Sequence, residues 1–294
     1  MRPFAWLPPQ PPMSPAAEAY AAECLRATAA VQARTRHVLD MAFGPDPWQK
    51  LDLYLPEAAG ASGLPTLLFM HGGYWTHGHK EWMGFMAPAF TSLPALFISV
   101  GYRLAPAAKY PAALEDCLAA LHWAYHHVAD YGGDPQRLFV GGHSAGGHLA
   151  TLMTLRPSLL IAWGLPAAAI KGCIAVSGVY DLSGDLPQDR LRAFLPPQVS
   201  AAEASPIAYV AGNRTPLLLV VGEHDFPVLR QQAYAMAAAL KAAGSPYELL
   251  DLPGVDHFQI SLQGADVHSP WVQRARKKMG SEYIFTEEAR KNVL

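Results

Sequence analysis

The residues best placed to do chemistry lie around Ser144, within Gly142-His143-Ser144-Ala145-Gly146. This G-x-S-x-G pattern puts a serine on a sharp strand-to-helix turn, where its hydroxyl stands clear of the sheet. A glycine two positions to either side lets the strand and helix backbones approach closely. Apolar residues precede and follow the pattern, as the strand and the helix require. Ser144 is therefore the predicted nucleophile, provided that the chain also supplies a base and an acid.

A base and an acid do follow, each directly after an apolar run. A serine hydroxyl becomes nucleophilic when a base removes its proton and a third group orients that base. In sheets of this kind the order along the chain is serine, acid, histidine. Asp225 follows the run 217–221, and His257 follows the run 247–252. We therefore predict Asp225 as the acid and His257 as the base.

Neighbouring residues leave alternatives for the acid and for the histidines. Glu223 and Asp256 are rival acids, although a carboxylate adjacent to the histidine in sequence usually points elsewhere. His143 and His148 flank the serine and are interpreted as packing or hydrogen-bonding residues.

A glycine-rich segment predicts the donors that a tetrahedral intermediate needs for its oxyanion. His71-Gly72-Gly73 follows the apolar run 66–70 directly, so the N–H groups of the two glycines can face the serine. The N–H of Ala145 is a third predicted donor. The serine, the acid, the histidine and these glycines, in this order and context, together predict a serine hydrolase of the α/β-hydrolase type.

Composition excludes several other classes of protein. The chain has 294 residues, of which 51% are hydrophobic and 16% charged, enough for a large core. A net charge of −2 gives no general attraction to nucleic acid or acidic membranes. His77-Gly78-His79 has no accompanying set of Cys, Asp or Glu ligands, so no metal or other cofactor is expected. The three cysteines are too scattered for a disulfide framework, and Cys173 is expected to be a buried, inert thiol.

The elements that must position these groups can be predicted along the chain. Ser14 is the expected N-cap of a helix at 15–33, and strands are expected at 36–43 and 49–55. Leu51, Leu53 and Leu55 alternate with polar residues, which predicts one wet face for the second strand. Further strands are expected at 66–70, 95–100, 138–140, 173–176, 217–221 and 247–252, with helices at 111–129, 146–155 and 228–243.

This alternation predicts an α/β fold with a mostly parallel central sheet and helices on both faces. We expect one domain over 1–294, with an N-terminal arm and helix at 1–35 and a C-terminal helix and tail at 263–294. The proline-containing segment 179–214 is a predicted small cap over the carboxyl ends of the strands. Basic residues at 274–278 are read as a solvated face. Early prolines argue against a secretory leader and no run can span a bilayer, so a cytoplasmic protein is expected, with a homodimer left open.

Several segments together resemble the kynurenine formamidases (arylformamidases), which hydrolyse N-formyl-kynurenine to kynurenine and formate in tryptophan degradation. The resemblance covers about residues 45–262. It is carried by His71-Gly72-Gly73-Tyr74-Trp75, Gly142-His143-Ser144-Ala145-Gly146-Gly147-His148-Leu149, Ser177-Gly178-Val179-Tyr180-Asp181-Leu182 and Gly222-Glu223-His224-Asp225. It implies a formyl-serine intermediate and a small-molecule substrate.

Aromatic and histidine side chains near these motifs are the expected substrate contacts. They are Tyr74, Trp75, His143 and Tyr180, with Phe194 of the predicted cap also expected near the ligand.

One segment favours a different group. Gly101-Tyr102-Arg103-Leu104-Ala105-Pro106 is more similar to the hormone-sensitive-lipase group of carboxylesterases, which usually have a third glycine where this chain has Tyr74. A small-molecule carboxylesterase is therefore the alternative activity. A remote alternative is a binding protein that has the hydrolase fold but no catalysis. Such proteins generally lack the serine or the histidine, and this chain has both.

Overall fold

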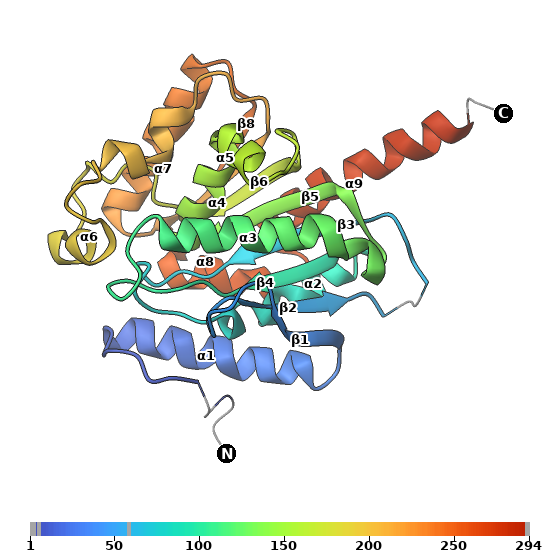
Figure 1. Ribbon diagram of the computed structural model, residues 1–294, viewed down its shortest axis with the longest axis horizontal. Helices are drawn as coiled ribbons and strands as arrows, with labels where there is room; N and C mark the ends of the chain where they lie inside the picture. Colours follow the sequence, from blue (N-terminus) through green and yellow to red (C-terminus); the bar gives the residue numbers. More distant parts are fainter. Residues whose placement is uncertain (1–3, 5–6, 58–59, 292–294) are drawn as a thin grey trace.

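A twisted eight-stranded sheet forms the centre of the computed structural model, which describes residues 4, 7–57 and 60–291 (Figure 1). Its spatial order is β1-β2-β4-β3-β5-β6-β7-β8. Strand β2 is antiparallel to both its neighbours. The six strands β3 to β8 are parallel to one another. The strands are β1 (Arg36–Ala42), β2 (Lys50–Leu55), β3 (Leu64–Met70), β4 (Leu96–Val100), β5 (Gly133–His143), β6 (Ile170–Val176), β7 (Leu217–His224) and β8 (Tyr247–Asp256). The predicted mostly parallel sheet is confirmed.

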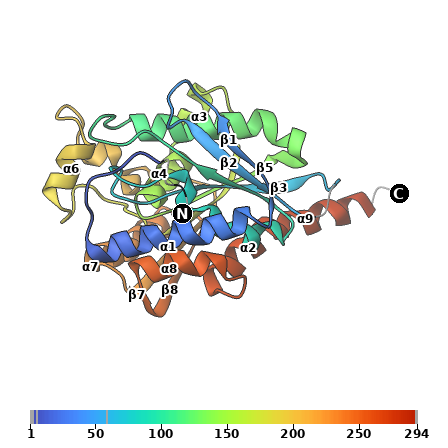
Figure 2. The ribbon, with the colours of Figure 1, turned by 90° about the horizontal axis from the view of Figure 1, so that it is seen from below.

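Helices cover both faces of this sheet. The α-helices are α1 (Pro15–Gln32), α2 (Ala87–Thr91), α3 (Ala112–His127), α4 (Ala145–Leu155), α5 (Pro157–Ala162), α6 (Gln188–Phe194), α7 (Pro227–Ala242), α8 (His257–Leu262) and α9 (Pro270–Lys291). Residues of α3, α4 and α7 pack in one core, and residues of α1, α2, α8 and α9 pack in another on the opposite face (Figures 1 and 2).

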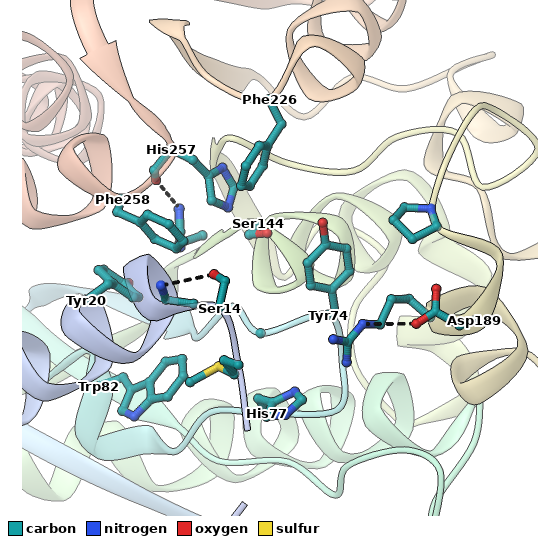
Figure 3. Close-up of a pocket in the computed structure, with 16 residues that line it drawn as sticks. Ser14, Tyr20, Tyr74, His77, Trp82, Ser144, Asp189, Phe226, His257 and Phe258 are labelled. Carbon is teal, nitrogen blue, oxygen red and sulfur yellow. Dashed lines mark hydrogen bonds and ion pairs between the residues drawn. The ribbon is translucent and has the colours of Figure 1, made fainter. Parts of the chain in front are cut away.

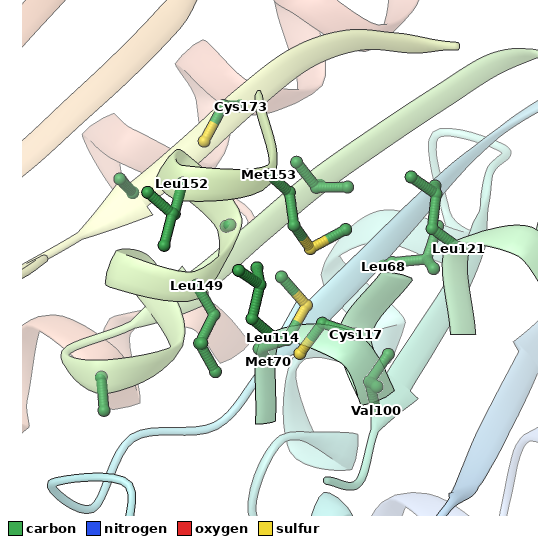
Figure 4. Packing of buried hydrophobic residues seen from close by; sticks show 14 of the residues in the cluster. Leu68, Met70, Val100, Leu114, Cys117, Leu121, Leu149, Leu152, Met153 and Cys173 are labelled. Atoms are coloured by element: carbon green, nitrogen blue, oxygen red, sulfur yellow. The ribbon is translucent and has the colours of Figure 1, made fainter. Parts of the chain in front are cut away.

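The two-residue period of the strands divides side chains between these cores. On β3, Leu68 and Met70 face α3 and α4, whereas Leu67 and Phe69 face the α1 side. Figure 4 shows Met70 meeting Leu114 and Leu149 in the first core. Because both faces are covered, the parallel strands consist of nearly continuous apolar residues.

The wet face expected for β2 is wrong. Asp52 and Tyr54 are both 0% exposed, because α1 and the short helical turns at 80–86 cover that side. Tyr54 accepts a hydrogen bond from Gln32 of α1 at 3.0 Å. The Asp52 carboxylate is paired with the Lys80 ammonium at 2.7 Å. In β2 the alternation of polar and apolar residues therefore separates two buried faces, one apolar and one with paired polar groups, and neither face is exposed to water.

Other predicted features lie close to their expected places. The helix predicted at 15–33 is α1, and the Ser14 hydroxyl accepts from the Ala17 N–H at 3.3 Å, as an N-cap does. Cys173 is buried, and this burial raises the pKa of its thiol to about 11. The basic residues of α9 are exposed at Arg274 and Lys277, as predicted for a solvated face, and half-buried at Arg276 and Lys278. Arg274 and Lys278 also pair with Glu248 of β8 at 3.3 and 3.1 Å. Within the described ranges, no helix has the length and apolar content needed to cross a bilayer.

The carboxyl ends of the central strands meet at one edge of the sheet. Met70 at the end of β3 is paired with Gly142 of β5, and His143 is paired with Val176 of β6. At the next pair, His224 of β7 is opposite Asp256 of β8. The segments that follow these strands therefore lie side by side, and they contain the residues for which the sequence predicts chemistry.

Candidate active site

Ser144 occupies the turn between β5 and α4 in a backbone conformation that side chains rarely adopt. Its φ of 55° and ψ of −117° lie outside the regions favoured by L-residues. Hydrogen bonds hold the turn, since the Ser144 N–H donates to the Val176 carbonyl at 2.9 Å and the Ser144 carbonyl accepts from His148. At Gly146 an added Cβ would lie 2.1 Å from the Met70 carbonyl oxygen. This clash explains why the motif requires glycine there.

Asp225 and His257 come together at the adjacent strand ends. His257 Nδ1 lies 2.8 Å from Asp225 Oδ1, which also accepts from the Phe226 N–H at 2.7 Å. The Ser177 hydroxyl donates to the other oxygen, Oδ2. Burial alone would raise the pKa of Asp225, but the hydrogen bonds and charge attraction from His257, with the bonds from Ser177 and Phe226, hold it below its ordinary value. An ionised Asp225 accepts a hydrogen bond from the Nδ1–H group, which leaves Nε2 of the ring able to accept a proton.

The two rival acids are engaged elsewhere. The Glu223 carboxylate accepts from the Gly254 N–H at 2.8 Å. The Asp256 carboxylate is the N-cap of α8, where it accepts from the N–H groups of Phe258 and Gln259 at 2.9 and 2.8 Å. The carboxylates of Glu223 and Asp256 therefore stabilise the loop and the helix on either side of His257. The carboxylate that contacts the His257 ring is that of Asp225.

The predicted oxyanion segment runs along the serine turn. A Cβ added to Gly72 would lie 3.1 Å from the Ser144 Cβ, so the two backbones are close. The Gly72 carbonyl is paired with the His71 ring at 2.8 Å, and the Gly73 carbonyl accepts from the N–H groups of Thr76 and His77. In a trans peptide the next N–H points the opposite way from the carbonyl. The N–H of Gly73 therefore points away from the His71 ring.

Ala145, the third predicted donor, is the first residue of α4. The leading N–H groups of a helix have no partner within the helix, so the Ala145 N–H is available at the serine turn.

His143 holds the base from the neighbouring turn. Its Nε2 donates to the His257 carbonyl at 2.9 Å, and the two rings are 4.6 Å apart. Burial, and next the nearby His257 ring, lower the pKa of His143 to about 3, so it is neutral near pH 7. The predicted hydrogen-bonding interpretation of His143 agrees with this position.

The same interpretation suits His148, whose ring is fully buried. Trp75 Nε1 donates to its Nδ1 at 3.2 Å, and its Nε2 donates to the Ala204 carbonyl at 2.7 Å.

A cavity of about 310 Å³ opens directly over Ser144 and His257 (Figure 3). That volume suits a small organic molecule. Its aromatic lining comes from Tyr20, Tyr74, Trp82, Phe226 and Phe258. The other lining residues are Met13, Ser14, Ala17, Gly73, His77, His143, Pro187, Asp189 and Arg190.

Parts of this lining could not be anticipated from local sequence patterns. Met13, Ser14, Ala17 and Tyr20 belong to α1 and its start, more than a hundred residues before Ser144. The Tyr20 hydroxyl is 2.8 Å from the Ser261 hydroxyl of α8, which fixes this wall against the segment that carries His257.

Two of the expected substrate contacts lie in the core instead of the cavity. Trp75 is 1% exposed and stacks on Phe194 at 4.2 Å, with only 13° between the ring planes. Tyr180 is 0% exposed among residues of the same core. Both side chains pack in the core and neither lines the cavity. Phe194 packs there with them, whereas Pro187, Asp189 and Arg190 of the same 179–214 segment do line the cavity.

Comparison with known proteins places these observations in a family. The sequence profile of the alpha/beta hydrolase fold family matches residues 67–261. The chain is 28% identical to a kynurenine formamidase of Danio rerio, over 79% of this chain and 78% of that protein. It is 33% identical to the carboxylesterase NlhH of Mycobacterium tuberculosis, over 68% of this chain and 67% of that protein. Among solved structures, an esterase of Pyrobaculum calidifontis superposes with a TM-score of 0.74 at 23% identity, over 92% of this chain and 99% of that one.

Proposed function

Because this chain belongs to the alpha/beta hydrolase fold family, we propose that it is a serine hydrolase whose nucleophile is Ser144. The observation that carries the proposal is the 2.8 Å contact between His257 Nδ1 and Asp225 Oδ1 beside the cavity that exposes Ser144. Nucleophile, base and orienting acid then act as a unit.

The proposed reaction uses each of these groups in turn. His257 Nε2 takes the proton of the Ser144 hydroxyl as its oxygen attacks the substrate carbonyl carbon. Asp225 stays ionised and stabilises the imidazolium that forms. The N–H groups of Gly72, Gly73 and Ala145 are the proposed donors to the oxyanion. His257 then returns the proton to the leaving group, and water releases the acyl group by the reverse use of the same residues.

The substrate that we propose is an N-formyl arylamine, with N-formyl-kynurenine the leading candidate, which would place the enzyme in tryptophan degradation. The Tyr74 ring lines the cavity directly after the oxyanion glycines, where it narrows the space for an acyl group. A formyl carbon carries only hydrogen and needs little room. The aromatic lining, with the similarity to a kynurenine formamidase, supports an aryl leaving group. The C–N bond breaks as His257 protonates the amine nitrogen, leaving a formyl ester on Ser144.

A small-molecule carboxylesterase is the second candidate. It is favoured by the similarity to the carboxylesterase NlhH, and it would use the same residues with an alcohol as the leaving group. Relative kcat/KM values distinguish the two activities, because specificity is a difference in transition-state binding.

The test combines labelling with substrate comparison. We expect a fluorophosphonate to label the protein and Ser144→Ala to abolish labelling, with turnover reduced by about three decades or more. Ser158→Ala, an exposed serine on α5, is the matched control and should label normally. N-formyl-kynurenine should be hydrolysed with a higher kcat/KM than aryl butyrates. Faster hydrolysis of the butyrates would replace the formamidase proposal with the esterase, and an unlabelled folded protein would exclude both.

A further inference from the structure

The cavity over Ser144 contains one pair of charged side chains in an otherwise aromatic and neutral lining. Among the described residues that line it, only Asp189 and Arg190 belong to the aspartate, glutamate, lysine and arginine types. Both come from α6, at the start of that helix. A guanidinium facing an aromatic-lined pocket can bind a planar anion through two parallel hydrogen bonds, which a lysine cannot do.

Arg190 reaches into the cavity rather than away from it. Its guanidinium carbon lies 5.6 Å from the centre of the Tyr74 ring, in cation–π range. After burial, the nearby Arg190 charge is the second cause that lowers the pKa of His77, another lining residue. In Figure 3 the Tyr74 ring stands between Ser144 and Asp189. The charged pair thus lies at the opposite end of the site from His257 and Phe226.

The pair is not needed to hold its helix. Arg190 Nε and Asp189 Oδ2 are 3.6 Å apart, and their side chains are 35% and 72% exposed, so the contact contributes little to stability. Leu191 and Phe194 anchor α6 through the core instead. Within the described part of the chain, the terminal nitrogens of Arg190 donate no hydrogen bond to another protein group. These nitrogens are therefore available to a ligand.

We propose that Arg190 and Asp189 bind the charged arm of the substrate, with Arg190 holding a carboxylate and Asp189 an ammonium group. The substrate class is then an aryl formamide that carries an α-amino acid arm. Tyr74 lies between the reacting carbonyl and this pair, where its ring can pack on the aryl group. This inference rests on the proposed formamidase function and adds the residues that select among formamides.

Its kinetic test compares a zwitterionic substrate with a neutral one of the same aryl formamide core. N-formyl-kynurenine carries both charges, and 2-formamidoacetophenone carries neither. Arg190→Gln should lower kcat/KM for the zwitterion roughly 10- to 100-fold, mainly through KM. The neutral analogue should lose far less, so the ratio of the two values should fall about 10-fold or more. Arg190→Lys should recover part of the loss.

Arg192→Gln is the matched control, because Arg192 is an exposed arginine on the same helix that does not line the cavity. It should leave both substrates and their ratio unchanged. An equal loss for both substrates in Arg190→Gln, or no loss for either, would overturn the inference.

Binding without turnover separates this inference from the proposed activity. Calorimetry on Ser144→Ala should show kynurenine binding at least about 10-fold tighter than 2-aminoacetophenone, with the preference removed by Arg190→Gln. If the wild type fails to hydrolyse formamides while this preference persists, the formamidase proposal is wrong, but the binding of the charged arm by Asp189 and Arg190 is supported. Equal binding of the two amines to Ser144→Ala would show that Asp189 and Arg190 do not bind the charged arm, whatever substrate the enzyme hydrolyses.

Discussion

The Ser177 hydroxyl donates a hydrogen bond to Oδ2 of Asp225, on the opposite side of the carboxylate from the oxygen that holds His257. Ser177 itself is fixed by a bond from its N–H to the Val220 carbonyl at 2.7 Å. The carboxylate is therefore clamped from both sides. A clamped acid presents the His257 ring in one orientation and stays ionised.

Removal of this clamp should weaken catalysis without unfolding the protein. Ser177→Ala takes one donor from a charged acceptor, so we expect kcat/KM to fall roughly 10-fold. The pKa of Asp225 should rise, because a bond that favours its ionised form is lost. The less stabilised carboxylate should also favour the protonated, inactive form of the His257 ring, so activity on the acid side should be lost at a higher pH. The pH dependence of kcat/KM measures this shift. Ser183 is an exposed serine that follows Ser177 closely in the chain, and Ser183→Ala should change neither the rate nor the pH dependence.

Replacement of the three acids near His257 should give unequal losses. Asp225→Asn removes the acceptor for the Nδ1 proton, and kcat should fall by about three to four decades. Glu223→Gln and Asp256→Asn alter carboxylates that bond to backbone N–H groups, so their kcat should stay within about tenfold of wild type. Steady-state kinetics on the three folded variants provides the comparison. A larger loss in either rival than in Asp225→Asn would reassign the acid.

Tyr74 should control the size of acyl group that the enzyme accepts. Its φ is 53°, a conformation that glycine adopts without strain, so Tyr74→Gly should fold while opening the cavity. The ratio of kcat/KM for aryl butyrates to that for N-formyl-kynurenine should rise roughly 10-fold or more. Tyr74→Phe keeps the ring and should preserve the ratio. An unchanged ratio in the glycine variant would show that another group limits the acyl side.

Acid should destabilise the protein through its buried neutral histidines. Burial lowers the pKa values of His71 and His143 to about 3 and that of His148 to about 4. An exposed histidine in the unfolded chain titrates near 6.5, so below that pH the unfolded state binds more protons and stability falls. Each histidine should contribute a slope that approaches about 1.4 kcal/mol per pH unit until its folded-state pKa is reached.

Urea unfolding between pH 7 and 5.5 measures this slope where few carboxylates titrate. His148→Gln should lower stability at pH 7 and also reduce the slope by up to one proton. His268→Gln changes an exposed histidine and should leave the slope as it is. A stability that is flat across this range would contradict the expected proton uptake.

Local patterns brought the candidate reacting groups to one site because each follows a strand that ends at the same sheet edge. The apolar runs located β5, β7 and β8, and the order of residues after them identified Ser144, Asp225 and His257 as candidates. The choice of Asp225 over Asp256 agrees with helix capping, since the Asp256 side chain turns back onto the α8 N–H groups.

Long-range packing set what the patterns could not predict. Trp75 and Tyr180 follow strand ends as the reacting groups do, yet their rings fill the core under the site, because Phe194 arrives there from a distant segment. The alternating pattern predicted that Asp52 would face solvent, but Lys80, 28 residues away, pairs with its carboxylate in the interior. Burial of this kind depends on partners that a sequence window does not contain.

The bond between Tyr20 and Ser261 joins residues 241 positions apart, and it fixes one wall of the cavity over Ser144. During synthesis α1 leaves the ribosome more than two hundred residues before its partner α8. Until α8 emerges, α1 can pack on the turns at 80–86, but its contact with α8 is absent and His257 has not been made. The wall that α1 forms with α8 and the proposed base, His257 at the start of α8, are therefore completed at nearly the same moment.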